Sequence, residues 1–518
     1  MPSAPATAAT GYRPRPASNL LKEIVEENLE ALLRVWDERF RDTHGPLQRR
    51  VRTVLDDFLR CGDVHFGFVR LKCCNPECPK KSERILPYAC RGRGLCPSCG
   101  QKRALTWAER MVEEVLPIVP YRQLVFTIPR NLRKPFLFDR SLYGDLCRVA
   151  YASTRDFLRS QASLLTRREK AVPAMIVSPQ SFGDILVHHP HGHACVSLGL
   201  FRRDGVFLPM DDVDFSGLEE IFRERFLRMM LRREKVRPET VERMRAWDHS
   251  GFAVNWERKI DRYDRKALEG LLSYMERAPV SLRRLTYRQD QGLVHYQGTR
   301  FHPRLGRDHQ LLPPLDFLAL LVPHIALRYE VTIRSYGALS TTFRKKAGWI
   351  EKPPVQQAPP HAKTLPTFQP RELDDPSLSI DPPSPPAPTT TAPTVLPPRD
   401  EEGEFASNRG RNWARLIART WLVDPEICSS CGERMRVVAA ISSPAQDDVI
   451  ERILKSRGDW DPPWMRPRKI RGPPPPIPGT PTSEKRSGHS PEEDWPEEID
   501  PPHPEFDLDP PFEDGRDG

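Results

Sequence analysis

The stretch Val187-His188-His189-Pro190-His191-Gly192-His193 carries the strongest structural signal in the chain. Successive side chains of a strand point to opposite faces, so His191 and His193 share one face. Apolar residues continue the alternation downstream, at Ala194, Val196 and Leu198. The pattern predicts a strand, and two imidazoles on one face of it predict half of a divalent-metal site. The alternative interpretation is a histidine-rich surface turn that scavenges metal.

The chain has 518 residues, enough for two or more domains with separate cores. Its 79 Lys and Arg residues exceed its 70 Asp and Glu residues, and the net charge of +9 allows a polyanionic partner. Arginine is concentrated in residues 202–346, whereas the tail from Pro491 is mostly acidic. This asymmetry is typical of a nucleic-acid-binding surface, although the interspersed Arg and Glu of 217–245 also fit a solvated helix face.

The N-terminus lacks the apolar segment of a signal peptide, and no run approaches the roughly 18 apolar residues of a membrane span. We therefore expect a cytoplasmic protein without a membrane partner. In that compartment its 11 cysteines would be reduced thiols or metal ligands rather than disulfides.

Composition divides the chain into six segments. Apolar residues recur at helical spacing from Leu21 to Trp36, and a second helix is expected to end near Leu59. The expected segments are a disordered start at 1–18, a helical and zinc-binding domain at 19–110, a mixed domain of strands and helices at 111–350, a Pro-rich linker at 351–410, a small module at 411–456 and a disordered, Pro-rich acidic tail at 457–518.

A block of cysteines between residues 61 and 99 predicts structural zinc. Cys96-Pro97-Ser98-Cys99 is a CxxC knuckle, and Cys74 with Cys78 forms a similar turn about twenty residues earlier. Tetrahedral Zn²⁺ is commonly held by two such turns, so the predicted ligands are Cys74, Cys78, Cys96 and Cys99. Residues that could replace them, or build a second site, are Cys61, His65, Cys73 and Cys90. The competing interpretation is a set of buried cysteines without metal.

Basic residues accompany this block. Arg91 and Arg93 lie inside it, and Lys102 and Arg103 follow it. Cations beside a metal loop suit contacts with the phosphates of a nucleic acid. A closed four-ligand zinc site is structural, so this region predicts binding rather than catalysis.

One further CxxC lies towards the C-terminus, from Cys428 to Cys431. Two thiolates are half of a zinc site, so a complete site would need ligands from elsewhere in the chain or from another chain. A partial zinc knuckle or a simple turn is favoured over a redox pair, which would need βαβ surroundings.

A helix is predicted around Tyr274 from a stripe of apolar residues, Leu268, Leu271, Leu272 and Met275. Tyr274 lies at the border of this stripe, where a tyrosine is usually only an amphipathic boundary residue. Beside a two-histidine metal site it gains a specific role. A phenol oxygen can attack a DNA phosphodiester that a divalent cation polarises, and the resulting phosphotyrosine conserves the bond energy for rejoining.

The order of these motifs resembles the HUH transposases of the IS91 family, which are rolling-circle insertion-sequence enzymes with an N-terminal zinc domain. The similar pieces are Cys90-Arg91-Gly92-Arg93-Gly94-Leu95-Cys96-Pro97-Ser98-Cys99, Val125-Phe126-Thr127-Ile128-Pro129, His191-Gly192-His193, Ser273-Tyr274-Met275-Glu276-Arg277-Ala278-Pro279, Arg334-Ser335-Tyr336-Gly337, Trp413-Ala414-Arg415-Leu416-Ile417-Ala418-Arg419 and Cys428-Ser429-Ser430-Cys431-Gly432. The likeness covers about residues 45–350 and 411–456.

The resemblance implies an α+β fold, with an N-terminal helical and zinc-ribbon-like domain and a central antiparallel sheet flanked by helices. In that sheet the strand at 123–128 would lie beside the histidine strand. His191 and His193 would bind a catalytic Mg²⁺ or Mn²⁺, and Tyr274 would be the nucleophile. The expected DNA contacts are Arg91, Arg93, Lys102, Arg103 and Arg277. The implied partners are single-stranded DNA at the ends of a mobile element and target DNA. The protein would associate with the nucleoid when it binds DNA. Whether it forms a homo-oligomer is left open.

The chain departs from the family pattern on the tyrosine helix. Many relatives carry two tyrosines four residues apart, but the position four before Tyr274 is Gly270. The chain therefore resembles the single-tyrosine branch, which includes the common-region elements. A second strand transfer would reuse Tyr274 or need a second protomer.

Several assignments stay open. The third metal ligand is left open: Gln180 or Asp184 could reach the histidine face, but structural hydrogen bonding is the favoured role of each. His188 and His189 precede Pro190 in an extended or turned backbone, where they would bind phosphate or lie on the surface.

Two other functions remain possible for the protein. One is a replication initiator or relaxase, which is disfavoured by the zinc block ahead of the catalytic strands. The other is a non-catalytic zinc-dependent DNA-binding protein derived from a decayed transposase.

Overall fold

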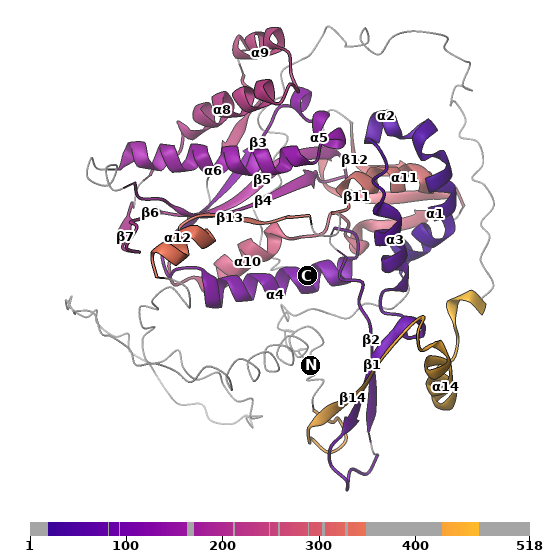
Figure 1. Ribbon diagram of the computed structural model, residues 1–518. Coiled ribbons are helices and arrows are strands. Elements are labelled where there is room, and N and C mark those ends of the chain that lie inside the picture. The colour runs from indigo at the N-terminus through magenta and orange to yellow at the C-terminus, as the bar shows by residue number, and fades with distance from the viewer. Residues whose placement is uncertain are drawn as a thin grey trace, which may run out of the picture.

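The computed structural model describes residues 19–465, except for 81, 93, 163–169, 211–212, 248, 257–258, 289, 303–305, 327–329 and 349–426. The predicted disordered start, the linker, the first part of the C-terminal module and most of the acidic tail lie outside the described residues. The described part is a mixed α+β structure with antiparallel sheets, as the sequence predicted (Figure 1). No helix in it is long and apolar enough to cross a membrane.

The largest sheet has six strands, each antiparallel to its neighbours. Their order is β13-β4-β5-β3-β8, and β9 also pairs with β3 (Figure 1). The strands are β3 (Tyr121–Thr127), β4 (Ala174–Phe182), β5 (His188–Ser197), β8 (Ala253–Asn255), β9 (Lys259–Ile260) and β13 (Arg334–Gly337), and the short hairpin β6 (Gly199–Phe201) and β7 (Phe207–Pro209) follows β5. The predicted histidine strand is β5 and the strand predicted beside it is β3, so both expectations are confirmed.

The register of β5 decides which side chains meet. On β4, Ser178 lies opposite His193 and Gln180 lies opposite His191. On β3, Thr127 lies opposite His191. Directly paired residues of antiparallel strands point to the same face, so the two histidines, the serine and the glutamine form one polar surface on the sheet.

Helices cover both faces of this sheet (Figure 1). They are α4 (Pro97–Arg110), α5 (Pro135–Phe138), α6 (Ser141–Gln161), α8 (Leu218–Arg232), α9 (Pro238–Arg245), α10 (Arg265–Met275) and α12 (Thr341–Lys346). On one face α6 and α8 bury Phe126, Val177 and Val196 in the largest core. On the other face α4 and α10 bury Ile176 and Cys195. The polar surface faces α10, because it alternates with the residues of the largest core.

The predicted N-terminal helices are present, as α1 (Leu20–Arg39) and α3 (Val51–Arg60), with the short α2 (Arg41–His44) between them. The side chain of Asn19 caps α1 by accepting a hydrogen bond from the Lys22 amide. These helices share a core with a later sheet and helix, β10 (Leu285–Arg288), β11 (Leu293–His302), β12 (Arg307–Leu312) and α11 (Pro314–Leu321). The predicted domain boundary at residue 110 therefore does not separate two independent cores.

A third sheet joins the two ends of the described chain. β1 (Gly67–Cys73) pairs with β2 (Glu83–Pro87) on one side and with β14 (Met435–Ser442) on the other (Figure 1). The described strand of the predicted C-terminal module therefore completes a sheet that begins near the N-terminus.

Burial of apolar surface explains this pairing. A hairpin of β1 and β2 alone would leave Phe68 and Leu71 in water, but both side chains are fully buried. Ile441 and the helix α14 (Asp447–Arg457) cover Phe68, and Met435 covers Leu71. The C-terminal segment thus supplies at least half of the buried residues in each of two small cores.

Phe68→Ala tests this account. The substitution leaves a cavity between β1 and α14, which should cost about 3–5 kcal/mol in the stability of this sheet. Hydrogen exchange of the β14 amides should accelerate by roughly a hundredfold or more, because opening of the sheet becomes that much easier. Val438→Ala is the control, since Val438 is on the same strand but 39% exposed. Equal exchange rates in the two variants would contradict the account.

Candidate functional site

Two buried histidines form the centre of the candidate site. His191 and His193 are 2% and 1% exposed, and their Nε2 atoms are 3.0 Å apart. The Nδ1–H of His191 donates to the carbonyl oxygen of His189 at 2.7 Å. A proton held on Nδ1 leaves the lone pair on Nε2, which is the arrangement of a metal-binding imidazole.

His193 is held in its neutral form. Burial lowers its pKa well below the usual range, and the nearby His191 and Arg277 lower the pKa further. Its Nδ1 has no hydrogen-bond partner among the described residues. A neutral ring in this position keeps a lone pair available as a ligand.

Tyr274 lies beside this pair, in the last turn of α10. The Asp264 side chain caps α10 by accepting a hydrogen bond from the Ala267 amide at 2.9 Å. The predicted apolar stripe is buried, which confirms the helix: Leu268, Leu271, Leu272 and Met275. The half-buried Tyr274 ring meets the His193 ring edge-on, with centroids 5.3 Å apart. The Arg277 guanidinium lies 4.4 Å from the centroid of the tyrosine ring.

The end of α10 is tied to β4 by its backbone. The carbonyl oxygen of Met275 accepts hydrogen bonds from the Ser178 hydroxyl at 2.9 Å and the Gln180 amide nitrogen at 3.3 Å. These bonds fix the height of Tyr274 above the histidines.

The two candidates for a third ligand have different surroundings. Gln180 is 5% exposed, and its Oε1 has no hydrogen-bond partner in the described part of the chain. Asp184 accepts from the Arg284 guanidinium at 2.6 Å and from the amides of Thr299 and Arg300 at 2.6 and 3.1 Å. Asp184 therefore holds loops together, while the Gln180 oxygen is free to take a ligand.

The donor set fits a hard divalent cation. Neighbouring ligands of an octahedral ion at about 2.1 Å stand about 3.0 Å apart. The separation of the two Nε2 atoms is 3.0 Å, and the buried Gln180 amide oxygen on the same face has no partner among the described residues. A cation bound by His191, His193 and Gln180 would remove the cost of leaving that oxygen unpaired.

Of the two preceding histidines, His189 is buried and His188 is half-buried. His189 is 6% exposed and its ring stacks on that of His191, with centroids 4.9 Å apart. The Nε2 of His188 is 3.4 Å from the hydroxyl of Tyr143, and burial lowers the pKa of His188 to about 2. The surface alternative is therefore wrong for His189, which is buried within β5.

A cleft that is open to solvent adjoins the site. Its lining includes Gln180, Arg277, Arg103, Tyr143, Phe182 and His324. The cleft thus combines three arginines with two aromatic rings next to the Gln180 amide group. Two of the arginines, Arg103 and Arg140, are paired with glutamates that also line the cleft.

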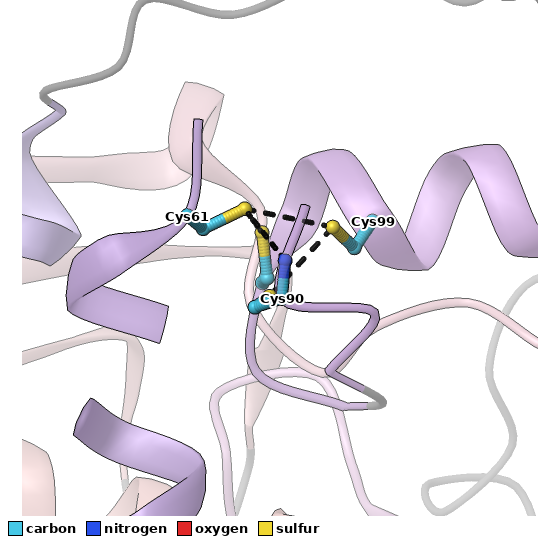
Figure 2. A group of neighbouring side chains, drawn as sticks. Cys61, Cys90 and Cys99 are labelled. Atoms are coloured by element: carbon cyan, nitrogen blue, oxygen red, sulfur yellow. Dashed lines mark hydrogen bonds between the residues drawn. The ribbon is translucent and has the colours of Figure 1, made fainter. Parts of the chain in front are cut away.

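Four cysteines form a compact group at the base of the β1–β2 hairpin: Cys61, Cys90, Cys96 and Cys99. Figure 2 shows the sulfur atoms of Cys61, Cys90 and Cys99 pointing toward one another, with Cys99 in the first turn of α4. Measured sulfur separations are 3.8 Å for Cys61–Cys96 and 3.6 Å for both Cys61–Cys99 and Cys90–Cys99. Tetrahedral zinc with Zn–S bonds of about 2.3 Å places its sulfurs about 3.8 Å apart. The group therefore has the dimensions of a four-thiolate zinc site.

The predicted ligand set of Cys74, Cys78, Cys96 and Cys99 is corrected. Cys74 is exposed and belongs to neither cysteine group of the described residues, and Cys78 lies in a second group with Cys73, Cys428 and Cys431. The seven residues of β1 span roughly 20 Å, which keeps the turn after β1 away from Cys96 and Cys99. An antiparallel hairpin instead brings together the residues before its first strand and after its second, here Cys61 and Cys90. A hairpin predicted from the sequence at this place would have indicated that Cys61 and Cys90 lie close together.

His65 is not a ligand. Its Nδ1 is 2.6 Å from a carboxylate oxygen of Asp63, and its Nε2 accepts from the Asp461 amide at 3.2 Å. The ring also packs edge-on against Trp460 and Trp464. His65 thus helps to hold the C-terminal segment.

The basic residues near the first cysteine group have separate surroundings. The ammonium group of Lys22 donates to the Cys61 carbonyl at 3.0 Å, and burial lowers its pKa while Asp63 and Cys61 favour its charge. Burial also lowers the pKa of Lys102, against the attraction of Cys99. Two ammonium groups beside four thiolates offset the negative charge of such a site.

The predicted DNA contacts differ in how accessible they are. Arg91 is exposed, and Arg93 lies outside the described residues. Arg103 forms an ion pair with the buried Glu276 at 3.0 Å, which connects α4 to the end of α10. Arg277 lines the cleft.

Part of the arginine-rich region is neutralised. Arg225 pairs with Asp156 at 2.6 Å, and Arg245 pairs with Glu224 at 2.9 Å. Ion pairs along α8 and α9 fit the alternative of a solvated helix face for this part of the chain.

Comparison with known proteins agrees with both regions. The family model described as a transposase zinc-binding domain matches residues 32–128, and the model described as a putative transposase matches residues 175–347. Together the two matches cover more than half of the chain. No solved structure matches.

Two curated relatives extend the likeness along the chain. The transposase for insertion sequence element IS801 of Pseudomonas savastanoi pv. phaseolicola is 24% identical over 352 residues, which are 64% of this chain and 77% of the relative. The putative transposase y4qJ of Sinorhizobium fredii (strain NBRC 101917 / NGR234) is 29% identical over 206 residues, 38% of this chain and 48% of the relative. The chain thus spans about half the length of the second relative. Because zinc-binding and transposase regions both match, in the order that the structure joins them, the chain belongs to the IS91 family of transposases.

Proposed function

We propose that this transposase cleaves and rejoins single-stranded DNA through a covalent phosphotyrosine on Tyr274, using Mg²⁺ or Mn²⁺ bound by His191, His193 and Gln180. The observation that carries the proposal is the contact between the Tyr274 ring and the ring of His193, whose Nε2 is 3.0 Å from that of His191. Nucleophile and metal ligands are therefore neighbours on one face of the sheet. Family membership sets aside a replication initiator or relaxase and leaves a non-catalytic transposase relative as the rival.

The chemistry assigned to Tyr274 is a transfer of one phosphodiester bond. Its oxygen gives up a proton and bonds to phosphorus, while the bond from phosphorus to a sugar oxygen breaks and that oxygen takes up a proton. The reverse reaction with another strand end rejoins DNA. A bound divalent cation supplies polarisation of a phosphate oxygen. The Arg277 charge, 4.4 Å from the Tyr274 ring centroid, favours the negative charge that develops beside it.

The proposed path of the strand follows the cleft beside the site. Arg277 would offer positive charge to the phosphates, beside Arg103, which is paired with Glu276. Arg91, Arg93 and Lys102 would extend the basic track toward the zinc-binding domain. The substrates would be the ends of a mobile element and its target DNA.

Gly270 limits how a second strand can be handled. It lies one turn before Tyr274, and a Cβ atom there would have no neighbour within 4 Å among the described residues. The position is open but carries no hydroxyl. A second transfer would therefore reuse Tyr274 or take place in a second protomer.

The four cysteines at the hairpin base would hold the structural zinc of the zinc-binding domain. The sulfur separations of 3.6–3.8 Å support this, together with the amides of Cys90 and Gly92, which donate to the sulfurs of Cys61 and Cys90 at 3.3 Å. Hydrogen bonds from neighbouring thiols, led by Cys90, lower the pKa of Cys61.

Tyr274→Phe should abolish covalent attachment to DNA, by roughly 10³-fold or more, because the nucleophilic oxygen is gone. The protein is incubated with single-stranded oligonucleotides from the flanking DNA and Mn²⁺, and adducts are measured on denaturing gels and by mass spectrometry of the phosphotyrosyl peptide. DNA affinity should remain within about twofold, because the ring and the basic residues stay in place. Tyr263→Phe is the matched control, since Tyr263 is 71% exposed and lies before α10. An adduct formed by Tyr274→Phe would disprove the assignment.

Gln180→Leu should raise the Mn²⁺ concentration needed for half-maximal cleavage by about tenfold or more, because the variant lacks the ligand oxygen. Gln180→Glu keeps an oxygen at the same place, so its half-maximal cleavage should need about the same Mn²⁺ concentration as the wild-type protein. Titration of the cleavage rate against Mn²⁺ measures both. If the leucine variant has the wild-type metal dependence, Gln180 is not a ligand.

Cys61→Ser should lose one equivalent of bound zinc per chain, because it removes one of four thiolates at the hairpin base. Cys74→Ser should keep the wild-type zinc content, since Cys74 is exposed and outside both cysteine groups of the described residues. Elemental analysis of purified protein gives the zinc content. Zinc loss from Cys74→Ser instead would restore the ligand set predicted from the sequence.

A further inference from the structure

We infer that the chain holds a second structural zinc ion, bound by Cys73, Cys78, Cys428 and Cys431, which fastens the C-terminal segment to the N-terminal hairpin. The ligand atoms of these four residues all lie within 4.8 Å of one another. The sulfurs of Cys73 and Cys431 are 3.5 Å apart, and those of Cys78 and Cys428 are 3.8 Å apart. These distances match the sulfur separation of about 3.8 Å around tetrahedral zinc.

Disulfide bonds do not explain the group. A disulfide requires sulfurs about 2.05 Å apart, and it pairs two cysteines rather than gathering four. Here each half of the chain contributes two thiols to one point. Cys78 and Cys428 are 3% and 1% exposed, so the point is also shielded from water.

The backbone around the group has the geometry of paired zinc knuckles. In each half, the amide two residues after the first cysteine donates to its sulfur: Asn75 to Cys73 and Ser430 to Cys428, both at 3.4 Å. The group at the hairpin base repeats this feature, from Gly92 to Cys90 at 3.3 Å. Amide donors favour thiolate over thiol, as a metal ligand requires.

The CxxC turn of the C-terminal half is formed by its own backbone. The Cys428 amide donates to the Glu433 carbonyl at 2.8 Å, and the Gly432 amide donates to the Cys428 carbonyl at 2.9 Å. Gly432 has φ +73°, which closes this turn without strain. A hydrogen bond of 2.9 Å between the hydroxyls of Ser82 and Ser430 then links the two halves outside the sulfurs.

The site lies where the pairing of β14 with β1 begins. Cys73 is the last residue of β1 and stands opposite Met435, the first residue of β14. A metal at this end fixes the register of a strand pair whose members are far apart in the sequence. The ion would therefore decide where the C-terminal strand docks, in addition to strengthening the contact.

Zinc content of the full-length protein tests the inference. Wild-type protein should contain two zinc ions per chain, and Cys428→Ser combined with Cys431→Ser should contain one. Cys61→Ser should also contain one, whereas Cys74→Ser should contain two. A wild-type content of one, or a content of two in the double variant, would overturn the second site. Circular dichroism of the double variant checks that the catalytic sheet still folds, and the remaining zinc ion shows that the first site is intact.

A second measurement tests the fastening. A protease site inserted between Pro383 and Ser384 allows the folded, zinc-loaded chain to be cut between its two halves. The two fragments of the wild-type chain should elute together in gel filtration at high salt. The C-terminal fragment of the double variant should elute separately, because its affinity for the N-terminal fragment is at least tenfold weaker. Equal retention of the two C-terminal fragments would show that zinc does not fasten the strand.

Discussion

The register of β5 between β3 and β4 is the constraint on which the candidate site depends. Residues of β5 that alternate with His191 and His193 are buried against α6 and α8 in the largest core. A slip of one residue would move this apolar set to the other face and send both imidazoles into that core. The apolar packing on the far face of the sheet thus determines the position of the polar groups on the near face.

The helix that carries Tyr274 is held from two directions. From the sheet, Ser178 and Gln180 donate to the carbonyl of Met275. From the zinc-binding region, Arg103 on α4 pairs with Glu276, which also accepts from the Thr332 hydroxyl at 3.0 Å. Because Cys99 lies in the first turn of the same α4, the four-cysteine group and the tyrosine are connected through one helix and one ion pair. This connection links the four-cysteine group to the helix that carries the candidate nucleophile.

Features set by local periodicity could be predicted from the sequence. The two-residue alternation of β5 and the helical stripe of α10 are properties of neighbouring residues, so both elements and the shared face of His191 and His193 were foreseen. The partners of the cysteines were not, because they depend on a hairpin and on a strand near the other end of the chain. The choice between Gln180 and Asp184 also depended on distant groups, since Asp184 is occupied by Arg284 and by backbone amides of a later strand.

The pairing of β14 with β1 has a consequence for synthesis. Cys73 and Cys431 are 358 residues apart. A ribosome adds about 5–20 residues per second, so β1 waits roughly 20–70 s for its partner strand to be made. During that time one edge of β1 and the apolar side chains beneath it have no cover, which exposes the nascent chain to proteases and to strand pairing with other chains. A transposase whose translation stops between β13 and β14 would contain every strand of the six-stranded sheet but could not complete the sheet that starts with β1.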